Sequence, residues 1–211
     1  MDNTKEMSKI AFNQQALTYD KDIKGQHART LYPYILNMLK GRHFSSILDL
    51  GCGTGELLYQ IQQIYHSKDL TGIDISDKMI DMANKKKINN AHFVIGDTED
   101  LPFKNNTFDI VICNDSFHHY PAPEKVLDEA YRVLKDIGII IIGDCWQPLF
   151  ARQLMNMYMK HSKEGDVKIY SKKEMIHLLL RKFHNVNHLS SYCPYMPNQP
   201  DRNSHAQIDK T

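Results

Sequence analysis

The chain has 211 residues, of which 42% are hydrophobic and 24% are charged, and its formal net charge is +1. This length suits one α/β domain with a complete core, and the composition excludes a disordered, collagen-like or coiled-coil chain. Because the net charge is so small, no overall field attracts the chain to nucleic acid or to an anionic membrane surface.

The cysteines form no Cys-x-x-Cys pair, which argues against a structural zinc site or a disulfide framework and suits a reducing compartment. Residues 1–9 are polar, and the longest apolar run, 137–143, is too short to cross a bilayer. We therefore expect a cytoplasmic protein with one domain over residues 1–211. The four cysteines are Cys52, Cys113, Cys145 and Cys193.

In chain order, residues 1–41 predict an N-terminal helical cap, because the apolar residues between Met7 and Leu39 are spaced for two helices. Residues 45–145 predict the ligand-binding core, in which short β-rich runs alternate with helical stretches. The predicted strands are 46–50, 70–75, 92–95, 108–113 and 137–143. The predicted helices between them are 56–65, 78–87 and 123–135. The alternation predicts an α/β fold with a doubly wound, mostly parallel sheet and helices on both faces.

Two segments follow this core. Residues 146–170 are rich in methionine and aromatic side chains, a pattern that is more often core packing. Their position above the strand ends favours a substrate lid as the alternative, because methionine surfaces adapt to varied apolar partners. Residues 171–211 predict a helix over 172–182 and a strand over 185–192. The polar tail after them leaves open whether a seventh strand is short, displaced or absent, and whether the tail is ordered.

The glycine-rich turn at 51–55 connects the first strand to the first helix of the core. Ligands of such sheets bind beyond the carboxyl ends of the strands, and glycines let the backbone approach them. A dinucleotide fingerprint would need glycine at the position of Glu56, whose charge would repel a pyrophosphate. S-adenosylmethionine has no phosphate and carries an ammonium and a sulfonium. Asp49, at the mouth of the turn, is suited to balance that positive charge.

Two further carboxylates follow the second and third strands. Asp74 lies 19 residues after Gly55 by direct count and can accept hydrogen bonds from both ribose hydroxyls; a helix cap is the alternative. Asp97 can accept from the adenine amino group, while the backbone amide of Thr98 can donate to a ring nitrogen. The remaining candidates are Ile75 and Met79, which are suited to form apolar walls around the adenine ring. Helix packing is an equal alternative for both.

Together these segments resemble the class I S-adenosylmethionine-dependent methyltransferases, in particular the small-molecule branch that includes the ubiquinone and menaquinone biosynthesis enzymes. The resemblance covers roughly residues 11–192. It implies that Gly51 and Gly53 border the methionyl part, that Asp74 holds the ribose and that Asp97 with Thr98 reads adenine. The motifs that carry it are 47–55, 72–76, 96–103 and 108–112.

The resemblance also extends to residues 12–20, which look like the family's N-terminal cap motif. Its tyrosine, here Tyr19, closes over the cofactor in the family; packing is the alternative.

The end of the fourth strand, residues 113–120, is rich in polar side chains and lies beside the transferring methyl group in this fold. Asn114 is expected to line the methionyl part. His118 and His119 are the candidates for a general base, because imidazole titrates near neutral pH. The alternative is that they only cap the following loop. We expect no metal, because no Asp, Glu or Cys stands at a supporting helical spacing.

The predicted function is in-line transfer of a methyl group from S-adenosylmethionine to a small, partly hydrophobic acceptor, with S-adenosylhomocysteine as product. The sequence does not name the acceptor. We expect no nucleic-acid or membrane partner and a monomer or homodimer. The alternatives are a non-catalytic S-adenosylmethionine-binding protein and an NAD-dependent oxidoreductase, since Asp74 would suit an NAD ribose equally well.

Overall fold

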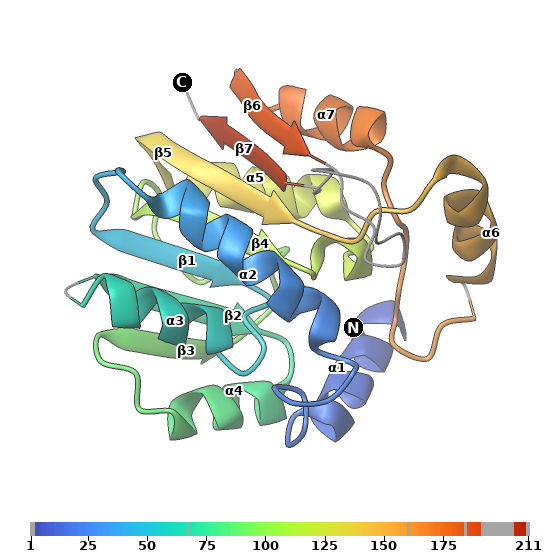
Figure 1. Cartoon of the computed structure of the whole chain (residues 1–211), viewed down its shortest axis with the longest axis horizontal. Helices are drawn as coiled ribbons and strands as arrows, with labels where there is room; N and C mark the ends of the chain where they lie inside the picture. The colour runs from blue at the N-terminus through green and yellow to red at the C-terminus, as the bar shows by residue number, and fades with distance from the viewer. Residues whose placement is uncertain (1–2, 67, 160, 184, 191–204, 210–211) are drawn as a thin grey trace.

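The computed structural model describes residues 3–66, 68–159, 161–183, 185–190 and 205–209, and for the last two ranges it describes the backbone alone. Helices and strands alternate along most of the chain (Figure 1). The helices are α1 (Asn3–Gln15), α2 (Gln26–Leu39), α3 (Glu56–Ile64), α4 (Asp77–Lys85), α5 (Pro123–Val133), α6 (Leu149–Met159) and α7 (Lys172–Leu180), with a 3-10 turn η1 (Phe117–His119). The strands are β1 (Ser46–Leu50), β2 (Asp69–Asp74), β3 (Ala91–Ile95), β4 (Phe108–Asn114), β5 (Leu134–Gly143), β6 (Asn185–Ser190) and β7 (His205–Asp209).

One sheet with the strand order β3-β2-β1-β4-β5-β7-β6 organises the molecule. Strands β1 to β5 run parallel, whereas β7 pairs antiparallel with both β5 and β6. The strand order reverses between β1 and β4, and a crevice opens at such a reversal beyond the carboxyl ends of the strands. The predicted doubly wound, mostly parallel sheet is confirmed.

The seventh strand, which the sequence left open, is a five-residue segment, His205–Asp209. The polar residues 191–204 and 210–211, on which the question of an ordered tail falls, lie outside the described residues.

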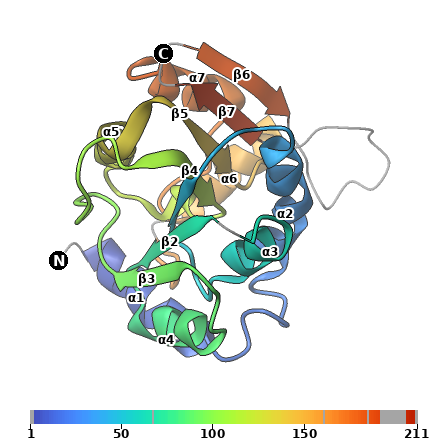
Figure 2. The same cartoon turned by 90° about the vertical axis from the view of Figure 1, so that its left-hand side faces the viewer.

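The two faces of the sheet bury separate apolar layers, and all five residues of β1 are buried. Ile47 belongs to the layer under α2 and α3, whereas Leu48 and Leu50 belong to the layer under α5 and α7. This alternation follows from the pleat of a strand, which points successive side chains to opposite faces. Figure 2 shows the sheet between these two helical layers. Helix α4 packs beside β2 and β3, and α1 packs against α4.

The boundary between α5 and β5 differs from the prediction. The expected helix ends two residues early, at Val133, and Leu134 already has extended torsions (φ −69°, ψ 139°). Leu134 pairs with Phe108 of β4, and the Lys135 ammonium contacts the Asp109 carboxylate at 2.8 Å. The strand pairing therefore outweighs the helical propensity of these two residues.

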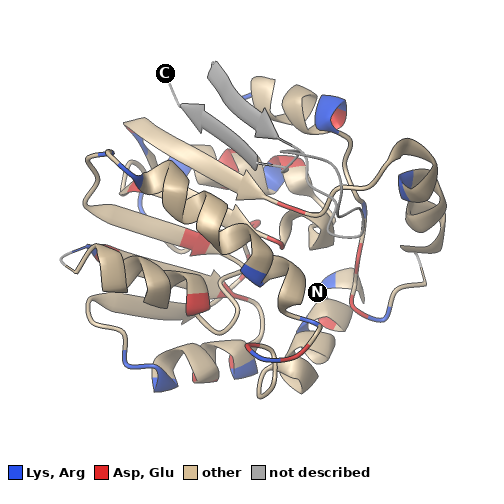
Figure 3. Cartoon of the chain, in the orientation of Figure 1, with Lys and Arg blue, Asp and Glu red and all other residues tan. Residues whose placement is uncertain are grey.

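Helix α6 is not part of the core, so core packing is the wrong interpretation for this helix within residues 146–170. None of its residues is buried, and the side chain of Phe150 is 83% exposed. Apart from Arg152 it carries no charge (Figure 3). Whether it acts as a substrate lid stays a prediction.

Among the parts of the chain that the structure describes, no helix has the length and apolar character needed to cross a bilayer.

Candidate active site

A cavity of about 890 Å³ lies beyond the carboxyl ends of the parallel strands, under α1 and the segment that follows it. Four aspartates line it, Asp49, Asp74, Asp97 and Asp115. Figure 3 shows red segments near these strand ends. All but one of the sequence-predicted site residues line the cavity: Tyr19, Asp49, Gly51, Gly53, Asp74, Ile75, Met79, Asp97, Thr98, Asn114 and His119. His118 does not.

The glycine turn between β1 and α3 forms the floor of this cavity. Gly51, Gly53 and Gly55 have φ values of +68°, +52° and +72°, which side-chain-bearing residues rarely adopt. The amides of Gly51 and Cys52 both donate to the Ile73 carbonyl, at 2.8 and 3.0 Å, and so tie the turn to β2. A Cβ atom at Gly51 would lie 2.7 Å from the Ser116 Cβ, so the packing of Ser116 against the turn leaves no space for a side chain here.

Asp74 ends β2 and ties the glycine turn to α4. One of its carboxylate oxygens accepts from the Gly53 amide and the other from the Ser76 amide, each at 2.8 Å. Burial raises the pKa of Asp74, and these backbone donors oppose that rise. The helix cap itself is Ser76, whose hydroxyl accepts from the Met79 amide. A carboxylate has about four acceptor positions, so the backbone donors do not use all of those on Asp74.

Asp49, inside β1, is a buried acid that lines the cavity. Its Oδ1 atom has no hydrogen-bond partner among the described residues. Burial, and then the neighbouring Asp74 charge, raise the pKa of Asp49 well above its ordinary value. A buried carboxylate is costly unless a cation or donors satisfy it. A positively charged ligand in the cavity would supply that compensation.

Asp97 and Thr98 follow β3 at the opposite end of the cavity. Asp97 accepts from the Glu99 amide at 2.9 Å, and its second oxygen accepts from the Lys5 ammonium at 2.7 Å. Lys5 belongs to α1 and also contacts Glu99 at 2.6 Å. No sequence pattern predicts this ion pair, because α1 and the loop after β3 are far apart along the chain.

The opposite wall combines aromatic and amide groups. Phe12 of α1 packs edge-to-face against Tyr19, with ring centroids 6.2 Å apart, and burial raises the pKa of the Tyr19 hydroxyl. Asn114, the last residue of β4, donates through Nδ2 to the Ala28 carbonyl at 3.3 Å. Its buried Oδ1 atom has no partner among the described residues.

The two adjacent histidines have different environments. The Nδ1 of His118 contacts the Asp144 carboxylate at the end of β5; burial alone would lower the pKa of His118, but Asp144 outweighs it and raises this pKa well above its ordinary value. His119 lines the cavity and packs against Phe12 at 5.1 Å. Burial, and then the charge on His118, lower the pKa of His119 to about 4.

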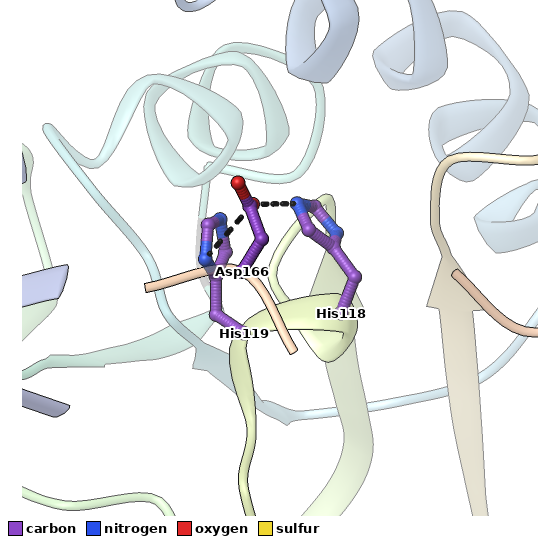
Figure 4. A group of neighbouring side chains, drawn as sticks. All are labelled: His118, His119 and Asp166. Atoms are coloured by element: carbon purple, nitrogen blue, oxygen red, sulfur yellow. Dashed lines mark ion pairs between the residues drawn. The ribbon is translucent and has the colours of Figure 1, made fainter. Parts of the chain in front are cut away.

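A carboxylate that the sequence analysis missed lies between these histidines. Asp166, from the loop after α6, is 3.7 Å from His118 Nε2 and 3.4 Å from His119 Nδ1 (Figure 4). The expectation of no metal rested on the absence of acidic residues at helical spacing. The fold supplies Asp166 from a distant segment instead, and no pattern in the sequence links it to the histidines.

Comparison with known proteins identifies the family. Residues 44–197 match the family described as "Methyltransferase domain", which is more than half of the chain. This chain belongs to that family of methyltransferase domains. The match covers the glycine turn, Asp74, Asp97 and both histidines, but it leaves out α1 and α2, which provide the cover of the cavity.

Individual relatives of the domain differ in their acceptors. A demethylmenaquinone methyltransferase of Thermotoga maritima is 31% identical over 117 residues, which are 54% of this chain and 51% of the relative. A malonyl-[acyl-carrier protein] O-methyltransferase of Bacillus cereus is 26% identical over 195 residues, 86% of this chain and 71% of the relative. The chain spans about half the length of the first curated relatives that it matches.

Solved structures show the same fold. An S-adenosylmethionine-dependent methyltransferase of Thermotoga maritima superposes with a TM-score of 0.69 and 19% identity, over the full length of both chains. This likeness confirms the fold of the methyltransferase domain.

Proposed function

We propose that this methyltransferase domain transfers a methyl group from S-adenosylmethionine to a small, partly apolar acceptor. The observation that carries the proposal is the cavity itself, in which the buried acids Asp49 and Asp74 meet a bare glycine turn. Asp49 Oδ1 is a buried acceptor without a partner among the described residues, which suits a ligand with an ammonium and a sulfonium.

The chain's own residues divide the ligand between them in this proposal. Gly51 and Gly53 leave room for the methionyl part, and Asp49 balances its ammonium with Asn114 as a further acceptor. Asp74 accepts from the ribose hydroxyls. The adenine takes the remaining contacts: Asp97 and Thr98 bind its edge, and Ile75 and Met79 pack against its faces. Tyr19 covers the bound ligand.

When bound, S-adenosylmethionine supplies an activated methyl group with a thioether as its leaving group. The protein has to align the acceptor with that methyl and exclude water, so no catalytic triad is needed. Of the two histidines, His119 is the one that faces the cavity, so it is placed to accept a proton from an acceptor that must lose one. His118 is held by Asp144 and acts behind it.

The acceptor class is drawn from the relatives. One acts on demethylmenaquinone and another on a malonyl group, so a small molecule of quinone type is the first candidate and an acyl carboxylate the second. The exposed apolar side chains of α6 suit a partly apolar acceptor, and we keep its role as a lid within this proposal. The proposal further includes a protein that acts as a monomer or homodimer without nucleic acid. It also includes a cytoplasmic location, which suits the free thiols of Cys52, Cys113 and Cys145.

Calorimetry of the full chain with S-adenosylhomocysteine, and separately with NADH, tests the cofactor. We expect binding of S-adenosylhomocysteine at one site and none of NADH; the reverse would establish the oxidoreductase alternative. Methyl transfer is tested with a donor labelled at the methyl group and two acceptor sets, demethylated quinols and malonyl thioesters. Cofactor binding without labelled product from these sets or from a metabolite extract would favour the non-catalytic alternative.

A further inference from the structure

Beside the cavity, three side chains that commonly ligate metal ions present their ligand atoms to one another. His118 and His119 belong to η1, and Asp166 comes from the loop after α6 (Figure 4). Asp166 Oδ1 lies 3.7 Å from His118 Nε2 and 3.4 Å from His119 Nδ1, and all three ligand atoms lie within 4.8 Å of one another. Ligands about 2.1 Å from a tetrahedral ion stand about 3.4 Å apart, so this spacing is close to that of a metal site.

The tautomer of His118 is fixed by a second carboxylate. Its Nδ1 contacts Asp144 Oδ1, which also accepts from the Cys145 amide at 2.7 Å. The other ring nitrogen, Nε2, is then the one that faces Asp166. Metal-ligating histidines usually donate their second ring N–H to a carboxylate in this way, which orients the ring and makes it a stronger ligand.

The backbone holds the two contributing segments together. The amides of Val167 and Lys168 both donate to the His118 carbonyl, at 2.8 and 3.2 Å. The Ser162 hydroxyl donates to Asp166 Oδ2 and leaves Oδ1 toward the histidines. The three ligand atoms are therefore positioned before any ion arrives, which lowers the entropy cost of binding one.

One ligand atom has no hydrogen bond to satisfy it. His119 Nδ1 is buried and without a hydrogen-bond partner among the described residues, and the His119 side chain is only 11% exposed. Its distance of 3.4 Å to Asp166 Oδ1 is long for a charged hydrogen bond but suits two atoms that share a metal ion. Buried polar atoms without a hydrogen-bond partner are rare, and coordination of an ion is one way to satisfy such an atom.

The geometry points to a divalent transition-metal site formed by His118 Nε2, His119 Nδ1 and Asp166, with Asp144 as the outer partner of His118. Two imidazoles and one carboxylate suit Zn²⁺ and its neighbours better than Mg²⁺ or Ca²⁺, which prefer oxygen ligands alone. The ion replaces a proton on His118 Nε2, which passes to the solvent.

This site would extend the chemistry of the cavity. Three protein ligands leave at least one coordination position open, and His119 also lines the cavity. An acceptor oxygen bound at that position would lose its proton more readily, because a divalent ion lowers the pKa of a bound oxygen. His119 would then serve as a ligand and not as a general base. Metal binding itself does not depend on the proposed methyl transfer.

The test is titration of the chelator-treated full chain with ZnCl₂ and CoCl₂, without S-adenosylhomocysteine. We expect one equivalent to bind, with the visible Co²⁺ bands of a four- or five-coordinate nitrogen and oxygen site. Asp144→Asn removes the outer partner of His118 and should weaken metal binding roughly 10- to 100-fold. Asp166→Asn and His119→Gln remove a ligand and should weaken metal binding by more than that. His161→Gln, an exposed histidine in the same segment, is the matched control and should bind as the wild type does.

Several results would overturn the inference. They are no stoichiometric uptake by the wild type, unchanged affinity in Asp166→Asn, and an equal loss in His161→Gln. A Co²⁺–thiolate band that disappears in Cys145→Ser would place the ion at the neighbouring group of His118, Asp144 and Cys145 instead. Thermal unfolding without metal shows whether each variant folds, and the wild-type Co²⁺ spectrum needs no variant. If the chain binds S-adenosylhomocysteine but takes up no metal, the metal site is refuted and the proposed function is not. If the chain takes up metal but does not bind S-adenosylhomocysteine, the proposed function is refuted and the metal site is not.

Discussion

Replacing Asp74 by Asn separates the two tasks of this carboxylate, holding the glycine turn and binding the ligand. In the wild type its two oxygens accept from the Gly53 and Ser76 amides, each at 2.8 Å. An asparagine keeps one carbonyl oxygen, so its NH₂ group must face one of these two donors. A hydrogen bond to a charged group contributes about 1.5–3 kcal/mol, whereas a neutral one contributes about 0.5–1.5 kcal/mol.

The loss of stability should be smaller than these figures, because the variant no longer has to bury a carboxylate. The cost of burying that carboxylate is visible in the raised pKa of Asp74. We expect the free energy of unfolding to fall by about 1–2 kcal/mol, read from the urea midpoint at constant slope. The effect on binding has no such offset. Loss of one charged hydrogen bond to a ribose hydroxyl, about 1.5–3 kcal/mol, corresponds to roughly 10- to 140-fold weaker binding of S-adenosylhomocysteine.

Isothermal calorimetry at neutral pH measures that loss, and Asp81→Asn is the matched control. Asp81 lies on α4 with its side chain 56% exposed, so the same change there should leave affinity and stability unaltered. A folded Asp74→Asn protein that binds S-adenosylhomocysteine within about twofold of the wild type would refute the reasoning, since about twofold is less than 0.5 kcal/mol.

Three further predictions concern stability. Phe117→Ala should cost about 3–5 kcal/mol in urea unfolding, because this ring is 1% exposed and packs against Tyr170; a cost below about 1 kcal/mol would contradict the packing. Ser171→Ala removes the capping box of α7 and should cost about 0.5–2 kcal/mol, and no loss of stability would refute the cap. Asp49→Asn should stabilise the ligand-free protein at pH 7 and weaken S-adenosylhomocysteine binding. Because the pKa of Asp49 is raised in the folded state, the folded chain binds the carboxyl proton more tightly than the unfolded chain does. The wild type therefore loses stability as pH rises above the unfolded pKa of 3.8, and the extra stability of the variant should vanish below that pH. A stability gain that does not depend on pH would contradict the assignment.

Residues whose place in the fold depends on nearby sequence could be predicted. The glycine turn, Asp74 and Asp97 each follow directly on a strand, and in a parallel sheet all these strand ends meet at one edge. Ser76 could be named as a cap candidate for the same reason, because a cap acts on the next few residues. Knowledge of periodicity and of strand direction was therefore enough to bring these groups to one cavity.

Contacts between distant segments could not be predicted. The Lys5–Asp97 ion pair joins α1 to β3, and Asp166 reaches η1 from the loop after α6. The start of β5 at Leu134 was decided by pairing with β4, against a helical pattern that continued past it. The exposure of α6 likewise depends on which surface lies beneath it, since its composition alone is typical of a core helix.

The sequence by itself determined the alternation of strands and helices, and with it the edge of the sheet where the cavity lies. Hydrophobic period and backbone freedom are local properties, and neither needs a partner far along the chain. Only the tertiary structure decided which of two adjacent histidines faces the cavity and which carboxylates, Asp144 and Asp166, stand beside them. Side-chain environments in a folded chain come from segments that the order of residues does not place side by side.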